Sequence, residues 1–531
     1  MSSELVLIAA DFSSSEHEDE HAVRFIAPQL RPSPPMHSRS LLVLALLSLF
    51  LLGCTAEEHS AQQPNVLLIV ADDLGYADIG AYNNDAFYET PHIDSLARRG
   101  MMFTDGYAAN PVCSPTRYSL LTGRAPSREN HTDWFCGDRT GRFRHARYDC
   151  SMDTTRVTLG DTFQDAGYDT WFGGKWHLGP DSIHWPEHQG FDVNKGGWRG
   201  GSPVAHGGGG YFSPYDNPRL RDGPDGEYLP FRLADEAEQF IENHRNEPFF
   251  ALLSFYEVHN PRQAPDSLVQ KYRRKRDRLD LNAKSEFEPI DVGQPWETGR
   301  AQKARVLQGN PVYAAMVDAL DQSVGQVLGA LSERGLSDHT VVVFVSDNGG
   351  LSTAEGHNTS NRPLRGGKGW VYEGGIRVPY VIHWPGVTDA GSTTEVPAIT
   401  TDLYPTLLDA AGLDLRPDQH VDGTSLAPVL KGRSSLDRRT LFWHYPHYSN
   451  QGGFPGGAVR MGSWKLVEDY RDGSVQLFNL AQDLGEQHNV ASRYPERVDR
   501  MRSRLHDWYD DVDAGFLRAK ENGPEPWRPG E

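Results

Sequence analysis

Two continuous apolar runs, each followed by an acidic turn, constrain the fold of this chain most. Residues 65–71 (NVLLIVA) and 340–345 (TVVVFV) consist mainly of aliphatic and β-branched residues. Such runs are typical of strands in a parallel sheet that helices cover on both faces. Because ligands of open α/β sheets bind beyond the carboxyl ends of the strands, the polar residues that follow each run are candidates for a site.

The polar residues after the two runs are carboxylates and one amide. Asp72 and Asp73 follow the first run, and Asp347 and Asn348 follow the second. Two adjacent carboxylates repel each other unless a proton or a cation lies between them. A solvated turn is the alternative interpretation of Asp72 and Asp73 from the residues alone.

The remaining periodicity predicts an α/β protein with two parts. A large, mostly parallel sheet sandwiched by helices is expected in residues 64–432, and a small C-terminal antiparallel sheet plus helix in residues 440–520. The expected helices cover residues 91–99, 159–166, 233–244, 313–331, 403–411 and 495–509, and the further strands cover residues 168–172, 249–256, 380–385, 458–461, 464–468 and 476–479.

A lone cysteine opens a predicted helix in residues 113–117 (CSPTR). Pro115 suits a first helical position, because its missing N–H is one that the first turn leaves unbonded. Cys113 would then lie at the positive end of the helix dipole, with Arg117 one turn further along. The residues alone leave a second interpretation open, in which Cys113 is a small core residue and Arg117 a solvated charge.

Four basic side chains lie in loops that suit anion contacts. Lys175 and His177 share a glycine-rich loop after a predicted strand, His259 follows another strand, and Lys368 lies in a loop rich in glycine. For His259 the alternative is an ordinary packing residue. The irregular, aromatic stretch 196–226 is expected to face the substrate, with four candidate contacts: Trp198, Arg199, His206 and Tyr211.

The N-terminal region predicts an exported lipoprotein. Residues 36–54 combine Arg39, an apolar run and a Leu-Leu-Gly-Cys end, as in a bacterial lipoprotein signal peptide with Cys54 as the lipidated residue. Residues 1–35 are interpreted as a non-native or disordered extension, and residues 55–63 as a linker. An ordinary secretory signal or an uncleaved anchor is the alternative. The location expected is periplasmic or on the cell surface.

The charge and the cysteines narrow the function further. A formal net charge of -20 argues against a nucleic-acid partner, so an anionic substrate requires a local basic cluster. Cys136 and Cys150 are left as a possible disulfide in an exported protein, with two free thiols as the alternative. The sequence contains no CxxC spacing, so the cysteines do not indicate a zinc site.

Residues 111–124 (PVCSPTRYSLLTGR) strongly resemble the signature of the formylglycine-dependent sulfatases, and the resemblance extends over about residues 65–503. It implies an alkaline-phosphatase-like core and a formylglycine (3-oxoalanine) made from Cys113 by a formylglycine-generating or sulfatase-maturing enzyme. It also implies one Ca²⁺ bound by Asp72, Asp73, Asp347, Asn348 and the modified Cys113. Hard cations take such oxygen ligands.

The same resemblance implies roles for the basic residues. Arg117 would hold the formylglycine hydrate, Lys175 would contact sulfate, and His177 would take a proton from the hydrate's second hydroxyl. His259 and Lys368 would flank the leaving oxygen. The implied reaction is attack of one hydroxyl on sulfur, release of an alcohol, and elimination of sulfate.

The expected function is therefore hydrolysis of a sulfuric ester, with a sulfated carbohydrate as the expected substrate and Trp198 and Arg199 as subsite candidates. Two alternatives remain open. One is a formylglycine-dependent phosphonate or phosphodiester hydrolase, and the other is a catalytically silent lipoprotein that binds sulfated glycans.

Overall fold

The computed structural model describes most of the chain after the predicted leader. The described residues are 63–135, 137, 139, 141–204, 209–244, 247–290, 303–437 and 440–530. The predictions for residues 1–62, including the lipidation of Cys54, lie outside this part, as do those for His206 and Cys136.

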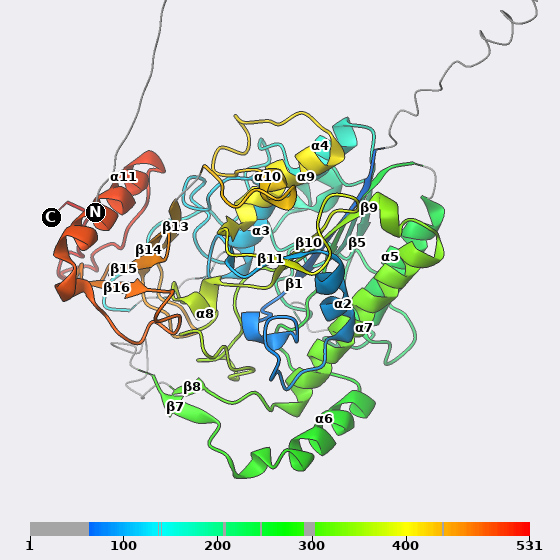
Figure 1. Cartoon of the computed structure of the whole chain (residues 1–531), viewed down its shortest axis with the longest axis horizontal. Helices are drawn as coiled ribbons and strands as arrows, with labels where there is room; N and C mark the ends of the chain where they lie inside the picture. Colours follow the sequence, from blue (N-terminus) through cyan, green and yellow to red (C-terminus); the bar gives the residue numbers. More distant parts are fainter. Residues whose placement is uncertain are drawn as a thin grey trace, which may run out of the picture. The chain divides into compact units, whose positions relative to one another are not determined.

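An eight-stranded sheet forms the centre of the large domain (Figure 1). All neighbouring pairs are parallel except those of β10, which runs antiparallel to β9 and β2. The prediction of a large, mostly parallel sheet is confirmed. In spatial order the strands are β11 (Ser392–Thr394), β2 (Met101–Phe103), β10 (Tyr380–His383), β9 (Thr340–Ser346), β1 (Asn65–Ala71), β6 (Phe249–Ser254), β4 (Asp169–Gly174) and β5 (Val193–Lys195).

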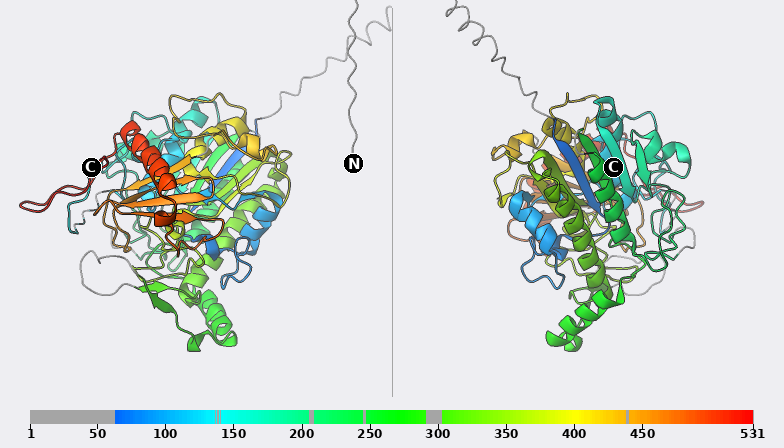
Figure 2. Two further views of the ribbon diagram at one scale, coloured as in Figure 1. Left: turned by 60° about the vertical axis from the view of Figure 1, so that its left-hand side comes forward. Right: turned by 90° about the vertical axis from the view of Figure 1, so that its right-hand side faces the viewer.

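Helices cover both faces of this sheet, as the apolar composition of β1 requires. Leu67 and Ile69 point to one face and Leu68 and Val70 to the other, and all four are buried. The first face packs against α2 (Pro91–Arg99), α5 (Leu229–Asn243) and α7 (Pro311–Glu333). The second packs against α3 (Cys113–Thr122), α4 (Leu159–Asp165), α9 (Leu403–Ala411) and α10 (Ala427–Leu430). The right-hand view of Figure 2 shows α7 running along its face of the sheet.

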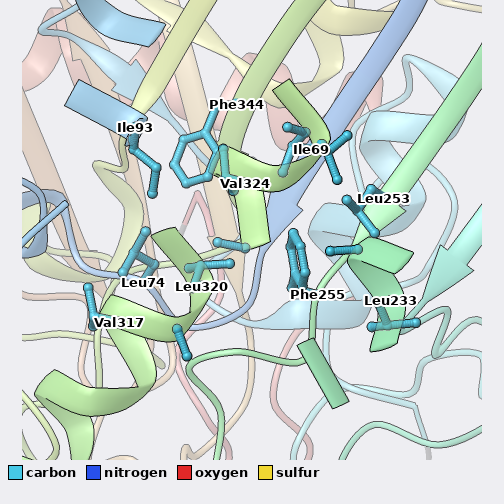
Figure 3. Packing of buried hydrophobic residues seen from close by; sticks show 14 of the residues in the cluster. Ile69, Leu74, Ile93, Leu233, Leu253, Phe255, Val317, Leu320, Val324 and Phe344 are labelled. Atoms are coloured by element: carbon cyan, nitrogen blue, oxygen red, sulfur yellow. The ribbon is translucent and has the colours of Figure 1, made fainter. Parts of the chain in front are cut away.

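The core beneath α7 fixes the two strands that carry the acidic turns. Val317, Leu320 and Val324 project from α7 toward Ile69 of β1 and Phe344 of β9 (Figure 3). All five side chains are fully buried. Burying an aliphatic or aromatic side chain of this size contributes about 1.5–3 kcal/mol. The carboxyl ends of β1 and β9 are therefore held on a tightly packed base.

The small C-terminal sheet is antiparallel and is covered by one helix, as predicted (Figure 2). Its strands are β13 (Thr440–Tyr445), β14 (Gly456–Met461), β15 (Trp464–Asp469) and β16 (Val475–Asn479), and α11 (Pro495–Asp511) packs on β14 and β15. The first strand, β13, was not predicted. Toward the end of β13 the side chains on both faces are buried. The strand therefore lacks the alternation of polar and apolar residues that identifies a strand with one solvent-exposed face.

The remaining elements are short or peripheral: β3 (Gly106–Tyr107) with β12 (Ala398–Ile399), β7 (Phe287–Pro289) with β8 (Lys303–Arg305), α6 (Asp266–Arg278) and α8 (Glu373–Ile376). Within the part of the chain that the structure describes, no helix is long and apolar enough to cross a membrane.

Candidate active site

The two acidic turns meet at one edge of the sheet. Because β1 pairs in parallel with β9, with Ala71 opposite Ser346, the residues after both strands leave at the same edge. The backbone N–H of Asp73 donates a hydrogen bond to Oδ1 of Asp347 over 3.2 Å. Nδ2 of Asn348 donates to Oδ1 of Asp73 over 2.8 Å. The structure thus brings together four of the five predicted metal ligands, and the solvated-turn interpretation is wrong because Asp72 and Asp73 are buried.

Three oxygens of this cluster have unused hydrogen-bonding capacity. Oδ1 of Asp72, Oδ2 of Asp73 and Oδ1 of Asn348 are buried without a hydrogen-bond partner among the described residues. Because buried polar groups normally have a partner, these three oxygens are candidate ligands for a cation. Ligand atoms of Asp72, Cys113 and Asp347 lie within 4.8 Å of one another. A divalent cation that prefers oxygen ligands fits this set.

Burial makes the cluster electrostatically unfavourable without such a cation. It raises the pKa of Asp72 to about 8, although Lys175 opposes the shift. Asp73 responds in the opposite direction, since Lys368 and His259 hold its pKa below the usual range despite burial. The two carboxylates therefore depend on nearby positive charge for their ionised forms.

Cys113 is the first residue of α3, and all ten residues of this helix are buried. The helix begins two residues before the predicted Pro115. Proline is tolerated at this third position because N–H groups of the first turn have no partner within the helix. The Cys113 side chain is only 3% exposed, and burial raises its pKa to about 11. The unmodified thiol is therefore protonated near neutral pH and is a poor nucleophile.

Arg117 links the helix to the acidic edge. Its Nε donates to Oδ2 of Asp347 over 2.8 Å, and its Nη1 donates to the carbonyl oxygen of Lys175 over 2.9 Å and to Oγ of Ser254. The interpretation of Arg117 as a solvated charge is wrong, since the residue is 5% exposed. Sequence reasoning missed Ser254. Its place at the end of β6, beside β1, is the signal that could have revealed it.

Lys175 and His177 share one loop beyond β4, as predicted, but face different partners. Nζ of Lys175 lies 2.6 Å from Oδ2 of Asp72. Nδ1 of His177 lies 3.1 Å from Oγ of Ser114, the residue after the cysteine. Burial, followed by the charge of Lys175, holds the pKa of His177 well below its usual value. A neutral imidazole is thus placed beside the start of α3, where it can accept a proton.

His259 and Lys368 lie next to Asp73. Nζ of Lys368 is 2.6 Å from Oδ1 of Asp73, and Nε2 of His259 is 3.9 Å from Oδ2. Nδ1 of His259 lies 2.7 Å from the carbonyl oxygen of Asn260, which can only accept, so Nδ1 carries the proton in neutral His259. Burial and Lys368 lower the pKa of His259 to about 3. The packing-residue alternative does not account for a histidine directed at this charge cluster.

The described candidates in the irregular stretch have different positions. Trp198 is buried, and its carbonyl oxygen accepts a 3.1 Å hydrogen bond from the backbone N–H of His177. Arg199 is exposed. The prediction that Tyr211 contacts substrate is wrong. Tyr211 is fully buried, and its hydroxyl donates to the carbonyl oxygens of Tyr256 and His259 over 2.7 and 2.8 Å.

Cys150 is disulfide-bonded, which excludes the free-thiol alternative for this residue. Its predicted partner, Cys136, lies outside the described residues.

Comparisons with known proteins identify the family. The Sulfatase family model matches residues 64–413, and a model described as N-sulphoglucosamine sulphohydrolase, C-terminal, matches residues 367–511. The chain is 29% identical to a sulfatase of Formosa agariphila, over 89% of this chain and 93% of the relative. It is 32% identical to the N-acetylgalactosamine-6-sulfatase of Canis lupus familiaris, over 76% and 72%.

A solved structure agrees with these relatives. Ps i-CgsB in complex with k-i-k-neocarrahexaose matches with a TM-score of 0.68 and 29% identity, over 85% of this chain and 94% of that chain. The large covered sheet and the small C-terminal sheet are those of an alkaline-phosphatase-like sulfatase. The chain belongs to the sulfatase family and is a sulfuric ester hydrolase.

Proposed function

We propose that this sulfatase releases inorganic sulfate from a sulfated carbohydrate, using a formylglycine made from Cys113 and one bound Ca²⁺. The observation that carries the proposal is the position of Cys113 beside the carboxylates of Asp72 and Asp347, in an acidic cluster where three oxygens lack a hydrogen-bond partner among the described residues. Five basic side chains surround the same point: Arg117, Lys175, His177, His259 and Lys368. A buried thiol with a raised pKa has little use as a nucleophile itself, which supports its conversion to another group.

The metal and the modified residue have separable roles in this proposal. Asp72, Asp73, Asp347 and Asn348 would hold the cation, whose charge neutralises sulfate oxygens. The hydrated aldehyde at position 113 supplies a hydroxyl nucleophile. Calcium is preferred over a transition metal because these four side chains offer only oxygen ligands.

The surrounding residues orient and neutralise the substrate. Arg117, fixed by Asp347 and Ser254, holds the group at the start of α3 in place. Lys175 contacts Asp72 and Lys368 contacts Asp73, so their ammonium groups can bind different oxygens of one sulfate. Preorganised positive charge of this kind favours the transition state, in which charge on the transferring group and leaving oxygen grows.

Two imidazoles divide the proton transfers. His177 is neutral and lies beside Ser114, so it can accept a proton from the group at position 113. Nε2 of His259 faces Asp73, which Lys368 also contacts, and in this proposal the two side chains stabilise the leaving oxygen. For His259 to donate a proton it must first gain one, and the negative charge of a bound sulfate favours that protonation.

The carbohydrate substrate is supported by the relatives, one of which is named for N-acetylgalactosamine 6-sulfate chemistry and another of which was solved with a neocarrahexaose. We also propose that the protein is exported and anchored by a lipid on Cys54, and that a formylglycine-generating or sulfatase-maturing enzyme is its partner. The lipoprotein-like sequence of residues 36–54 supports the export and anchoring. Incorporation of labelled fatty acid into the wild type, and not into Cys54→Ser, would test the anchor.

The central test combines mass spectrometry with turnover. Protein co-produced with a maturation enzyme should carry an aldehyde at position 113 and release sulfate from N-acetylgalactosamine 6-sulfate, with activity lost on chelation and restored by Ca²⁺. Cys113→Ala should melt at the wild-type temperature and release no sulfate. Faster cleavage of phosphodiesters or phosphonates than of any sulfate ester would favour the formylglycine-dependent alternative. Binding of sulfated glycans without turnover by fully modified protein would favour the silent-lipoprotein alternative.

A further inference from the structure

A hollow of about 690 Å³ opens between the segment before β5, at Pro180 and Trp185, and the irregular stretch after β5. Its lining includes two tryptophans, two arginines and two aspartates: Trp185, Trp198, Arg199, Asp216, Arg221 and Asp222. We propose that this hollow binds a second pyranose unit of the glycan whose sulfate ester lies at position 113. The inference rests on the proposed function and extends it from a sulfated sugar to an oligosaccharide.

A short partition separates the hollow from the catalytic residues. The carbonyl oxygen of Trp198 accepts the backbone N–H of His177, and Gly201 lies so close to the His177 ring that a Cβ there would overlap it. The carbonyl oxygen of Gly200 also accepts a hydrogen bond from the Tyr256 hydroxyl. Residues 198–201 thus contact the catalytic loop, while Trp198 and Arg199 line the hollow. The hollow therefore lies directly beside the loop that carries His177, separated from it by residues 198–201.

The lining chemistry matches a sugar better than a second free anion. The charged side chains that line the hollow are two arginines and two aspartates, which balance, so they provide no net positive field. Together with Asn217 they offer both donors and acceptors, which is what sugar hydroxyls require. Trp185, which is half-buried, adds flat apolar surface against which the C–H face of a pyranose can pack.

The polar groups are not all used by the protein itself. Arg221 is exposed and forms no hydrogen bond or ion pair with another described residue. Oδ1 of Asp222 accepts the backbone N–H of Tyr215 over 2.6 Å, which fixes that carboxylate at the rim. Arg221 is therefore available to a ligand, and Asp222 is held in position.

The tryptophan that defines one wall is held in place before any ligand binds. The Arg219 guanidinium lies 5.3 Å from the centre of the Trp185 ring, and Arg219 is paired with Glu187. The neighbouring His184 carbonyl oxygen accepts a 2.6 Å hydrogen bond from Nε1 of the buried Trp176. Because the wall is preformed, little conformational entropy is lost when a sugar packs on it.

The test compares a tetrasaccharide ending in N-acetylgalactosamine 6-sulfate with the monosaccharide N-acetylgalactosamine 6-sulfate. We expect Trp185→Ala to lower kcat/KM for the tetrasaccharide about tenfold more than for the monosaccharide. Arg221→Ala should also lower kcat/KM more for the tetrasaccharide than for the monosaccharide. Trp464→Ala is the matched control, because Trp464 is also half-buried with an arginine, Arg497, 4.2 Å above its ring, and lies in the small sheet. The control should leave the ratio of the kcat/KM values for the two substrates unchanged.

An equal loss of kcat/KM for both substrates would overturn the proposal, because Trp185 would then affect catalysis only through the His177 loop. No loss of kcat/KM for either substrate would overturn it as well, because the hollow would then have no effect. If the wild type cleaves neither sugar, the proposed function fails for this substrate, and binding decides the inference separately. In that case the Cys113→Ala protein should bind the tetrasaccharide by calorimetry and lose this binding when Trp185→Ala is added. Absent or unaltered binding would reject the hollow as a sugar site. Melting temperatures of all variants exclude a folding defect as the cause.

Discussion

A buried ion cluster between the large domain and the small sheet allows the contribution of buried ion pairs to the free energy of unfolding to be tested. Nζ of Lys465, on β15, lies 2.9 Å from Oε1 of Glu373 and 2.9 Å from Oε1 of Glu486, and all three side chains are fully buried. Glu373 belongs to α8 of the large domain and also pairs with Arg377 over 3.2 Å. Lys465 is therefore the cation that two buried carboxylates share.

Replacing Lys465 with methionine keeps the volume and removes the charge. Glu373 retains Arg377, but Glu486 is left facing a second carboxylate in a dry environment. Breaking a buried pair by removing one partner costs about 3–5 kcal/mol. The unfolding entropy of a domain of this size is on the order of 1 kcal/mol/K, so Lys465→Met should lower Tm by roughly 3–5 °C.

A second substitution separates this electrostatic cost from lost packing. Burial raises the pKa of Glu486 to about 7, so glutamine resembles its protonated form closely. Adding Glu486→Gln to Lys465→Met removes the uncompensated charge and should recover about 1–2 kcal/mol, measured by calorimetric or denaturant unfolding as a double-mutant cycle. The reasoning would be refuted if the losses of unfolding free energy caused by Lys465→Met and Glu486→Gln were strictly additive in the double variant. A loss below about 1 kcal/mol for Lys465→Met alone would refute it too.

Two further predictions concern the metal and pH. Asn348→Ala removes an unpartnered oxygen from the proposed cation site, so half-maximal sulfate release after chelation should need at least about tenfold more Ca²⁺; an unchanged requirement would place the cation elsewhere. His444 is buried between the Tyr470 hydroxyl and the Gly515 carbonyl oxygen, and burial lowers its pKa to about 4. Its neutral form stabilises the fold fully above the unfolded pKa of about 6.5, and up to roughly 3 kcal/mol is lost as the pH falls toward 4. Urea unfolding from pH 7 to pH 4 should show a shallower decline for His444→Gln than for the wild type or for a variant of the exposed His188; equal slopes would contradict this assignment.

The elements with strong local signals were predictable from sequence. β1, α2 and α9 have the predicted bounds, because continuous apolar runs, a proline near a helix start and a glycine after a helix end are local features. The acidic edge also followed from sequence, since parallel neighbouring strands end on the same side. These signals explain why Asp72 and Asp347, far apart in the chain, could be assigned to one site.

Features made by distant parts of the chain left no such signal. The pairing of Lys465 with Glu373 joins residues from different domains, and nothing in either neighbourhood indicates the other. The contact of Ser254 with Arg117 likewise depends on the order of strands, which periodicity does not reveal. Short strands such as β2 and β5, of three residues each, have too few positions to show any alternation.

The complete burial of α3 has a consequence for how an active enzyme is made. Under the proposed chemistry a maturation enzyme must bind the chain around Cys113, yet in the folded protein all ten residues of α3 are buried and Cys113 is only 3% exposed. Under the proposed chemistry, conversion of the cysteine must therefore precede the closing of the domain, during synthesis or export. On this proposal, molecules that fold before conversion would stay inactive, so the active fraction of a preparation would depend on the relative rates of maturation and folding.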